Sequence, residues 1–239
     1  MGSSSPTFSL PPQRAVFAGL LFDMDGTIID STSAVEKHWH TIGEELGEDP
    51  NVILQTSHGR RSIDVLKLLR PEKATWEYVK HMEGQLPLKY GSDAVEIPGA
   101  RSLLDSIRGA NVPWAIVTSG TMPLVSGWLD VLKLPHPEHL VVAEDVENGK
   151  PDPTCYIMGR EKLGLQSDAE VLVLEDSPAG IKAGKAAGCK VVGVVTSHTV
   201  EQIVDARPDW IIKDLDSLKM VGNSNRGVEL EFLNALNVK

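Results

Sequence analysis

The sequence predicts an α/β fold, with a doubly wound parallel sheet as its core and an all-helical domain inserted into it. Short continuous apolar runs recur along the chain, segments of helical spacing lie between them, and one long span near the N-terminus contains helical patterns alone. Runs that are apolar at every position are typical of parallel strands covered on both faces. Alternating strands and helices then favour a doubly wound sheet.

Five short apolar runs and a weaker sixth predict the strands of this sheet. Between them, segments 99–109 and 178–188 have helical spacing and end at a glycine, as helices commonly do. The predicted strands are 16–23 (VFAGLLFD), 114–119 (WAIVTS), 139–145 (HLVVAED), 171–176 (VLVLED), 190–196 (KVVGVVT) and, more weakly, 210–215 (WIIKDL).

Helical patterns dominate the span after the first strand. Segments 32–46, 63–69 and 76–86 each place apolar residues on one helical face. Asp30 and Ser31 are interpreted as caps of the first of these helices. The predicted organisation is a disordered tail at 1–14, a core formed by 15–30 and 96–239, and a helical insert at 31–95. The segment after Asp216 fits either an edge strand or a short helix.

Composition limits the partners that we expect. The 239 residues suffice for one core and an accessory domain, and the net charge of -10 disfavours nucleic acid or an anionic membrane as a partner. No apolar stretch reaches the roughly 18 residues of a membrane helix. Cys155 and Cys189 have no CxxC spacing, which fits a reducing, cytoplasmic location. Nothing in the sequence demands an obligatory protein partner.

Polar residues follow several of the predicted strands. In open parallel sheets, ligands bind outside the carboxyl ends of the strands, so we expect these residues to form one site. A lysine lies between a glycine and a proline in GKPDP, in the connection before the fourth strand. The candidate site residues of the core are Asp23, Asp25, Thr118, Ser119, Lys150, Glu175 and Asp176.

The residue types in this set indicate phosphoryl transfer. Converging carboxylates repel one another unless a cation lies among them, and hard oxygen ligands suit magnesium (Mg2+). A carboxylate can then attack phosphorus while the metal and Lys150 neutralise the phosphoryl oxygens. Asp23 and Asp25 are two positions apart and would share one face of a strand, so one can attack while the other transfers protons.

Four motifs of the chain resemble those of the haloacid dehalogenase superfamily of phosphohydrolases. They are DMDGT at 23–27, the strand end at Thr118 and Ser119, Lys150 in GKPDP, and EDSPAG at 175–180. The resemblance runs from about residue 15 to residue 216. It implies a Rossmann-like core, and the helical insert is similar to the helical cap that closes over the site in that family.

The resemblance also implies a role for each core residue. Asp23 would be the nucleophile that forms an aspartyl-phosphate, and Asp25 would protonate the leaving group and then activate water. Magnesium would be held by Asp23, Asp176 and the main-chain carbonyl of Asp25, with Glu175 in support. Thr118, the amide of Ser119 and Lys150 would hold the phosphoryl oxygens.

Candidate substrate contacts lie in the insert. The stretches 56–64 and 82–91 are similar to those of fungal glycerol-phosphate phosphatases and of the related 2-deoxyglucose-6-phosphate phosphatases. They place His58, Arg60, Arg61 and Glu83 as candidate substrate residues. For the two arginines, a surface position with solvent-exposed salt bridges is an equally good interpretation. The expected substrate is a small-molecule phosphate ester, first glycerol 3-phosphate (glycerol 1-phosphate), with 2-deoxyglucose 6-phosphate or another sugar phosphate as the alternative.

Three other functions are disfavoured. Phosphosugar mutases of the same superfamily carry a histidine ten positions after the second motif aspartate, and that position is Val35 here. Dehalogenases lack the second acid, and Asp25 is present. A regulatory protein without activity would have lost a nucleophile or a metal ligand, but Asp23, Lys150 and Asp176 are all present. The sequence therefore predicts a hydrolase of phosphoric monoesters.

Overall fold

A computed structural model describes residues 7–57 and 60–237, and its centre is a six-stranded sheet. Every neighbouring pair in this sheet is parallel, in the order β10-β9-β8-β3-β6-β7. All six predicted strands contribute to it. Their bounds are β3 Gly19–Phe22, β6 Trp114–Val117, β7 His139–Val141, β8 Val171–Glu175, β9 Lys190–Val194 and β10 Trp210–Ile212.

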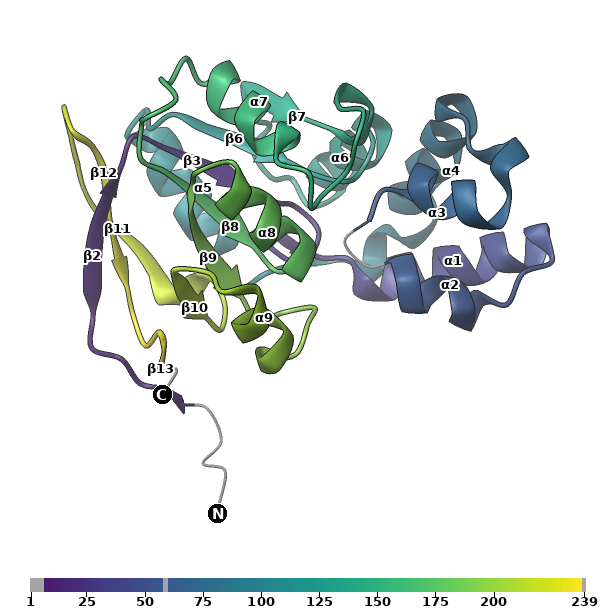
Figure 1. The fold of residues 1–239 in the computed structure, drawn as a ribbon, viewed down its shortest axis with the longest axis horizontal. Helices are drawn as coiled ribbons and strands as arrows, with labels where there is room; N and C mark the ends of the chain where they lie inside the picture. The colour runs from purple at the N-terminus through teal and green to yellow at the C-terminus, as the bar shows by residue number, and fades with distance from the viewer. Residues whose placement is uncertain (1–6, 58–59, 238–239) are drawn as a thin grey trace.

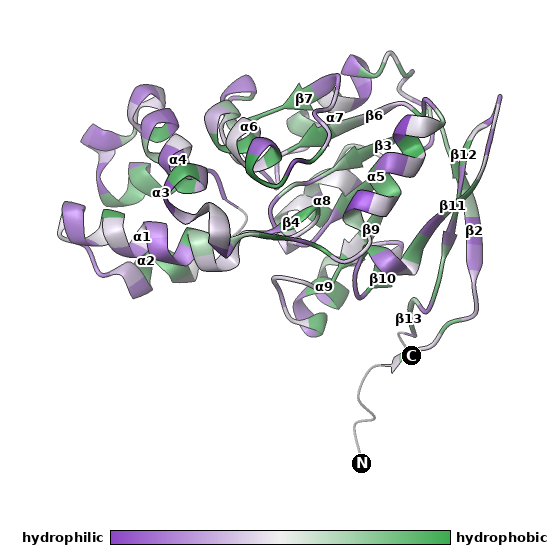
Figure 2. Cartoon of the chain, turned by 180° about the vertical axis from the view of Figure 1, so that it is seen from behind, coloured by the Kyte–Doolittle hydropathy of each residue, from purple (hydrophilic) through white to green (hydrophobic). Residues whose placement is uncertain are grey.

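Helices cover both faces of the sheet, which confirms the doubly wound prediction (Figure 1). In β3, Leu20 and Phe22 pack into one buried cluster with α5 and α6, whereas Leu21 packs into a second with α7, α8 and α9. Figure 2 shows the central strands as largely hydrophobic. The helices are α5 Ala100–Gly109, α6 Met122–Val131, α7 Thr154–Lys162, α8 Pro178–Ala186 and α9 Val200–Ala206.

The first predicted strand, 16–23, is wrong in one respect, because the chain divides it between two sheets. The chain bends at Ala18, whose amide donates to the carbonyl of Glu170 at 2.8 Å. Before the bend, β2 (Gln13–Phe17) pairs antiparallel with β12 (Gly227–Phe232), which pairs with β11 (Leu218–Ser224). The segment after Asp216 is therefore mainly a hairpin beside β2 (Figure 1).

The prediction of a disordered tail at 1–14 is wrong for its second half. Strand β1 (Thr7–Phe8) pairs antiparallel with β13 (Leu236–Asn237), and β2 begins at Gln13. Phe8 also packs against the cluster that contains Leu21. These strands gain order from partners at the opposite end of the chain. Residues 1–6 lie outside the described residues.

The insert consists of helices packed around a small core of their own. Trp39, Ile53, Leu66 and Val79 are buried in that core. The chain leaves the sheet through β4 (Ile29–Asp30) and returns through β5 (Val95–Glu96), and these two strands pair side by side. The helices are α1 Thr32–Leu46, α2 Pro50–Ser57, α3 Ser62–Leu69 and α4 Trp76–Tyr90.

Single 3-10 turns connect several elements. They are η1 Pro71–Lys73, η2 Gly91–Asp93, η3 Ala143–Asp145 and η4 Leu215–Ser217. Within residues 7–57 and 60–237, none of the helices is both long enough and apolar enough to cross a membrane.

Candidate active site

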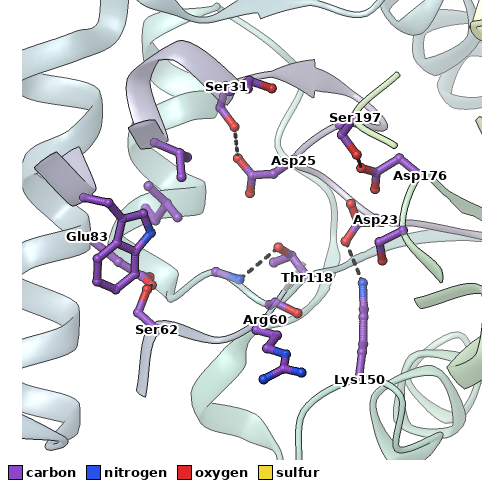
Figure 3. Close-up of a pocket in the computed structure, with 18 residues that line it drawn as sticks. Asp23, Asp25, Ser31, Arg60, Ser62, Glu83, Thr118, Lys150, Asp176 and Ser197 are labelled. Atoms are coloured by element: carbon purple, nitrogen blue, oxygen red, sulfur yellow. Dashed lines mark hydrogen bonds and ion pairs between the residues drawn. The ribbon is translucent and has the colours of Figure 1, made fainter. Parts of the chain in front are cut away.

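A pocket of about 110 Å³ lies where the insert faces the carboxyl edge of the sheet (Figure 3). The core contributes Asp23, Asp25, Thr118, Ser119, Lys150 and Asp176 to its lining. Trp39, Arg60, Ser62 and Glu83 line it from the insert. The structure therefore brings together six of the seven core candidates at one pocket, and Glu175 lies directly behind it, bonded to Lys150.

Asp23 follows β3 and is fixed by both its backbone and its side chain. Its amide donates to the carbonyl of Leu174 in β8 at 3.0 Å, and its Oδ1 accepts from Lys150 Nζ at 2.6 Å. The turn that follows requires glycine. Gly26 has φ 90°, and a Cβ there would lie 2.1 Å from Oδ2 of Asp176. The glycine therefore allows Asp176 to approach the backbone beside Asp23.

Lys150 is a buried cation held between two carboxylates. Its Nζ donates to Asp23 Oδ1 and to Glu175 Oε1, both at 2.6 Å, and to the carbonyl of Val117 at 3.2 Å. Burial favours the neutral amine, but the charges of Asp23 and Glu175 outweigh it and raise the pKa of Lys150. The lysine is therefore positively charged at the base of the pocket.

Glu175 is fully buried, and both of its oxygens are engaged. Oε1 accepts from Lys150 and from the hydroxyl of Tyr156 at 2.8 Å, and Oε2 accepts from the amide and hydroxyl of Ser177, each at 3.0 Å. Burial alone would raise the pKa of Glu175, but Lys150 and these donors lower it. This geometry fits a residue that orients Lys150.

Asp23, Glu175 and Asp176 form a cluster that suits a cation. Each offers an oxygen, and these oxygens lie within 4.8 Å of one another. Burial and the charge of Glu175 raise the pKa of Asp176 to about 7, and burial also raises the pKa of Asp23. Lys150 is one positive charge against three carboxylates, so a hard cation would relieve the remaining repulsion. The donor set therefore fits a metal ion.

Asp25 receives a hydrogen bond that the sequence did not predict. Ser31 Oγ donates to Asp25 Oδ1 at 2.5 Å (Figure 3). Burial raises the pKa of Asp25, and this hydrogen bond opposes the rise. Asp30 does cap α1, because its Oδ1 accepts from the amide of Thr32 at 3.0 Å, but the side chain of Ser31 makes no cap bond. Ser31 does occupy the N-cap position of α1, but the prediction that its side chain caps the helix is wrong, because its hydroxyl bonds Asp25.

Thr118 and Ser119 follow β6 directly, at the start of the loop that leads to α6. Thr118 Oγ1 accepts from the amide of Gly120 at 3.0 Å, which fixes the loop. Thr118 and Ser119 both line the pocket. Their place next to Lys150, which bonds the carbonyl of Val117, is compatible with binding of phosphoryl oxygens.

The four candidates from the insert have different outcomes. Arg60 lines the pocket. Glu83 also lines it, and its carboxylate accepts from Ser62 Oγ at 2.5 Å and from the amide of Thr121 at 2.8 Å. Arg61 is buried and bonds main-chain carbonyls of the core, so its prediction as a substrate residue is wrong. His58 lies outside the described residues.

Ser197 and Ser62 are pocket residues that sequence reasoning missed. Ser197 follows β9, and its hydroxyl donates to Asp176 Oδ2 (Figure 3). The rule that sites lie beyond strand ends, applied to the strand 190–196, could have found it. Ser62 carries no such signal, because its role depends on the contact between α3 and Glu83 of α4.

Glu83→Gln should stabilise the protein at alkaline pH. Burial raises the pKa of Glu83 to about 7 from an ordinary value of 4.5. Between about pH 4.5 and about pH 7, the Glu83 carboxyl holds its proton more tightly in the folded state than in the unfolded chain. The free energy of unfolding therefore falls as the pH rises through this range. Glutamine keeps an acceptor for Thr121 and does not ionise. The variant should gain up to about 3 kcal/mol at about pH 8.

Urea unfolding of both proteins at about pH 5 and about pH 8 measures this difference. An identical pH dependence in the two proteins would show that Glu83 does not titrate as its burial implies.

The chain belongs to the haloacid dehalogenase-like hydrolase family, whose model matches residues 20–194. A solved structure of a hydrolase from Pseudomonas syringae superposes with a TM-score of 0.69, covering 83% of this chain and 94% of that one at 24% sequence identity. This likeness supports the fold. The predicted Rossmann-like core is confirmed by this likeness, and the match of the family model confirms the resemblance to this superfamily.

Two curated relatives indicate the enzyme class. Glycerol-1-phosphate phosphohydrolase 1 of Saccharomyces cerevisiae is 40% identical over 213 residues, which cover 86% of this chain and 85% of the relative. The yeast 2-deoxyglucose-6-phosphate phosphatase 1 is 35% identical, covering 90% of this chain and 95% of the relative. The predicted class, a phosphoric monoester hydrolase, is confirmed by these relatives.

Proposed function

We propose that this enzyme is a magnesium-dependent phosphatase of small polyol phosphates, with glycerol 3-phosphate (glycerol 1-phosphate) as its preferred substrate. The observation that supports it most is the contact of Asp23 with Lys150 beside the carboxylates of Glu175 and Asp176. Such a site offers a nucleophile, a fixed positive charge and a cation position in one place.

In the proposed reaction, a carboxylate oxygen of Asp23 attacks the phosphorus, and the bond from phosphorus to the alcohol oxygen breaks. Asp25 gives its proton to the departing alkoxide, so the alcohol leaves neutral. A water molecule then attacks the phosphorus of the aspartyl-phosphate, and Asp25 accepts a proton from this water. Phosphate departs and the carboxylate of Asp23 is restored. Ser31 holds Asp25 in place for both transfers.

The phosphoryl group would lie between Lys150 and the loop after β6. Lys150 supplies a fixed charge, and Thr118 and Ser119 supply hydrogen-bond donors. Bound magnesium would add positive charge beside the phosphoryl oxygens. Asp23, Asp176 and the main-chain carbonyl of Asp25 would hold it, with Glu175 in support through Lys150 and Ser177.

The space beyond the phosphoryl site favours a small alcohol. The whole pocket, with the phosphoryl site included, measures about 110 Å³, and Trp39 forms part of its wall on the side of the insert. Arg60, Ser62 and Glu83 offer polar groups to hydroxyls of the substrate. The yeast glycerol-1-phosphate phosphohydrolase is more similar in sequence than the 2-deoxyglucose-6-phosphate phosphatase, at 40% against 35% identity. The second relative makes a sugar phosphate the second candidate.

A panel of phosphate esters tests the proposal. We expect phosphate release in magnesium to be fastest with glycerol phosphates, slower with 2-deoxyglucose 6-phosphate, and abolished by EDTA until magnesium is restored in excess. Faster hydrolysis of 2-deoxyglucose 6-phosphate would make the sugar phosphate the preferred substrate in place of glycerol phosphate. Full activity in EDTA would refute the metal requirement. Conversion of a hexose 1-phosphate into its 6-phosphate would instead indicate a mutase. The cytoplasmic location and the lack of an obligatory partner stay predictions.

A further inference from the structure

Arg61 is a buried cation that the proposed reaction does not use. Its side chain is 3% exposed. Nε and Nη2 donate to the two oxygens of Asp64 at 2.7 and 3.0 Å. Nη1 donates to the carbonyls of Ala143 and Val146 at 3.2 and 2.7 Å, and Nη2 donates to that of Glu147 at 2.9 Å. These bonds account for all five N–H groups of a guanidinium, so none is left for a substrate.

The bonds of Arg61 join the insert to the core. Arg61 and Asp64 lie at the start of α3, in the insert, whereas the three carbonyls belong to the core segment 143–147. The pair of Arg61 with Asp64 is internal to the insert. If the insert moved away, the guanidinium would keep its counter-ion and the carbonyls could bond water. The contact can therefore break without leaving an unpaired buried charge.

The bonded core segment leads directly to Lys150. Gly149 packs against the guanidinium, since a Cβ there would lie 2.8 Å from Nε of Arg61 and 3.2 Å from Oδ2 of Asp64. The next residue, Lys150, must reach Asp23 and Glu175. The backbone held by Arg61 is therefore the backbone that presents the active-site lysine.

We propose that Arg61 is a positioning residue that couples closure of the insert to the placement of Lys150. When the insert is closed, the planar guanidinium of Arg61 holds segment 143–149. This contact fixes the position of the Lys150 amine relative to Asp23. The expected change in kcat rests on the proposed function of the site, whereas the expected change in hydrogen exchange does not. Lysine cannot replace the arginine, because an ammonium has three donors and no planar fork.

The test compares Arg61→Met and Arg61→Lys with the control Arg70→Met. Arg70 is a suitable control because its guanidinium bonds the carbonyl of Leu46 and the carboxylate of Glu48, both within the insert. Hydrogen exchange of segment 143–150 is the first measurement and needs no substrate. The amides of Ala143 and Asp145 are hydrogen-bonded, so their exchange reports opening of the segment.

We expect both Arg61 variants to exchange faster at 143–150 while β3 and β8 stay protected, and Arg70→Met to match the wild type. With the preferred phosphate ester, kcat should fall about a hundredfold in Arg61→Met while KM changes little. If Arg61→Met does not fold, Arg61→Lys carries the test.

Unchanged exchange at 143–150 in the Arg61 variants would overturn the proposal, and so would a raised KM at constant kcat, which indicates a substrate contact. If the wild type hydrolysed no phosphate ester, the proposed function would fail while the exchange measurement still decided the role of Arg61.

Discussion

Asp23→Asn should reduce phosphate release by about 10⁴-fold or more. The amide oxygen of asparagine has nearly the shape of the carboxylate oxygen but is a poor nucleophile, so the covalent step is lost. The variant should still fold, because Asp23 sits in a buried cluster with Glu175 and Asp176, and removal of one negative charge lessens their repulsion. Phosphate release from a glycerol phosphate with excess magnesium measures the loss.

Asp105→Asn is the matched control for this variant. Asp105 is exposed on α5, where it pairs with Arg108 at 3.6 Å. It should retain the wild-type rate. Comparable phosphate release by Asp23→Asn and the control would refute covalent catalysis by Asp23.

Asp25→Asn should lower turnover of a glycerol phosphate by about 10²- to 10⁴-fold, which is the usual contribution of general acid–base catalysis. A glycerol alkoxide leaves poorly without a proton, whereas nitrophenolate leaves readily. With p-nitrophenyl phosphate, the first step should therefore survive in the variant and the second should not, because Asp25 must also activate water. Rapid mixing should show a burst of about one nitrophenolate per enzyme.

Nitrophenolate release without a burst, at the wild-type rate throughout, would contradict the role of Asp25 in the second step. Ser31→Ala provides a graded comparison, since Asp25 keeps its carboxyl but loses the donor at 2.5 Å.

Local patterns sufficed for most of the fold. The strands of the central sheet are apolar at nearly every position, and α1 has the same bounds as its predicted segment, 32–46. The errors arise where partners are distant in sequence. The bend at Ala18 divides an apolar run because β2 pairs with β12, more than two hundred residues away. Strand β1 likewise depends on β13.

The same distinction applies to the site. Motif residues at strand ends could be found because the carboxyl ends of parallel strands meet at one edge. The contacts of Arg61 and Glu83 with the core could not be assigned from sequence, since their partners in the core are main-chain groups of residues 143–147 and of Thr121. Because every residue type carries main-chain groups, a side chain that bonds the backbone places no requirement on the residue type of its partner. The partner of the Ser31 hydroxyl was predicted wrongly, because a serine at the N-cap position usually bonds the helix with its side chain, whereas Ser31 bonds Asp25.

Trapping the covalent intermediate tests the central claim most directly. The enzyme is quenched during turnover of a glycerol phosphate and treated with borohydride, which reduces an acyl phosphate to an alcohol. Peptide mass spectrometry should then find homoserine at position 23, at a level that depends on substrate, and aspartate at position 25. Aspartate at both positions under conditions of rapid turnover, or homoserine at position 25, would contradict the assignment of Asp23 as the nucleophile.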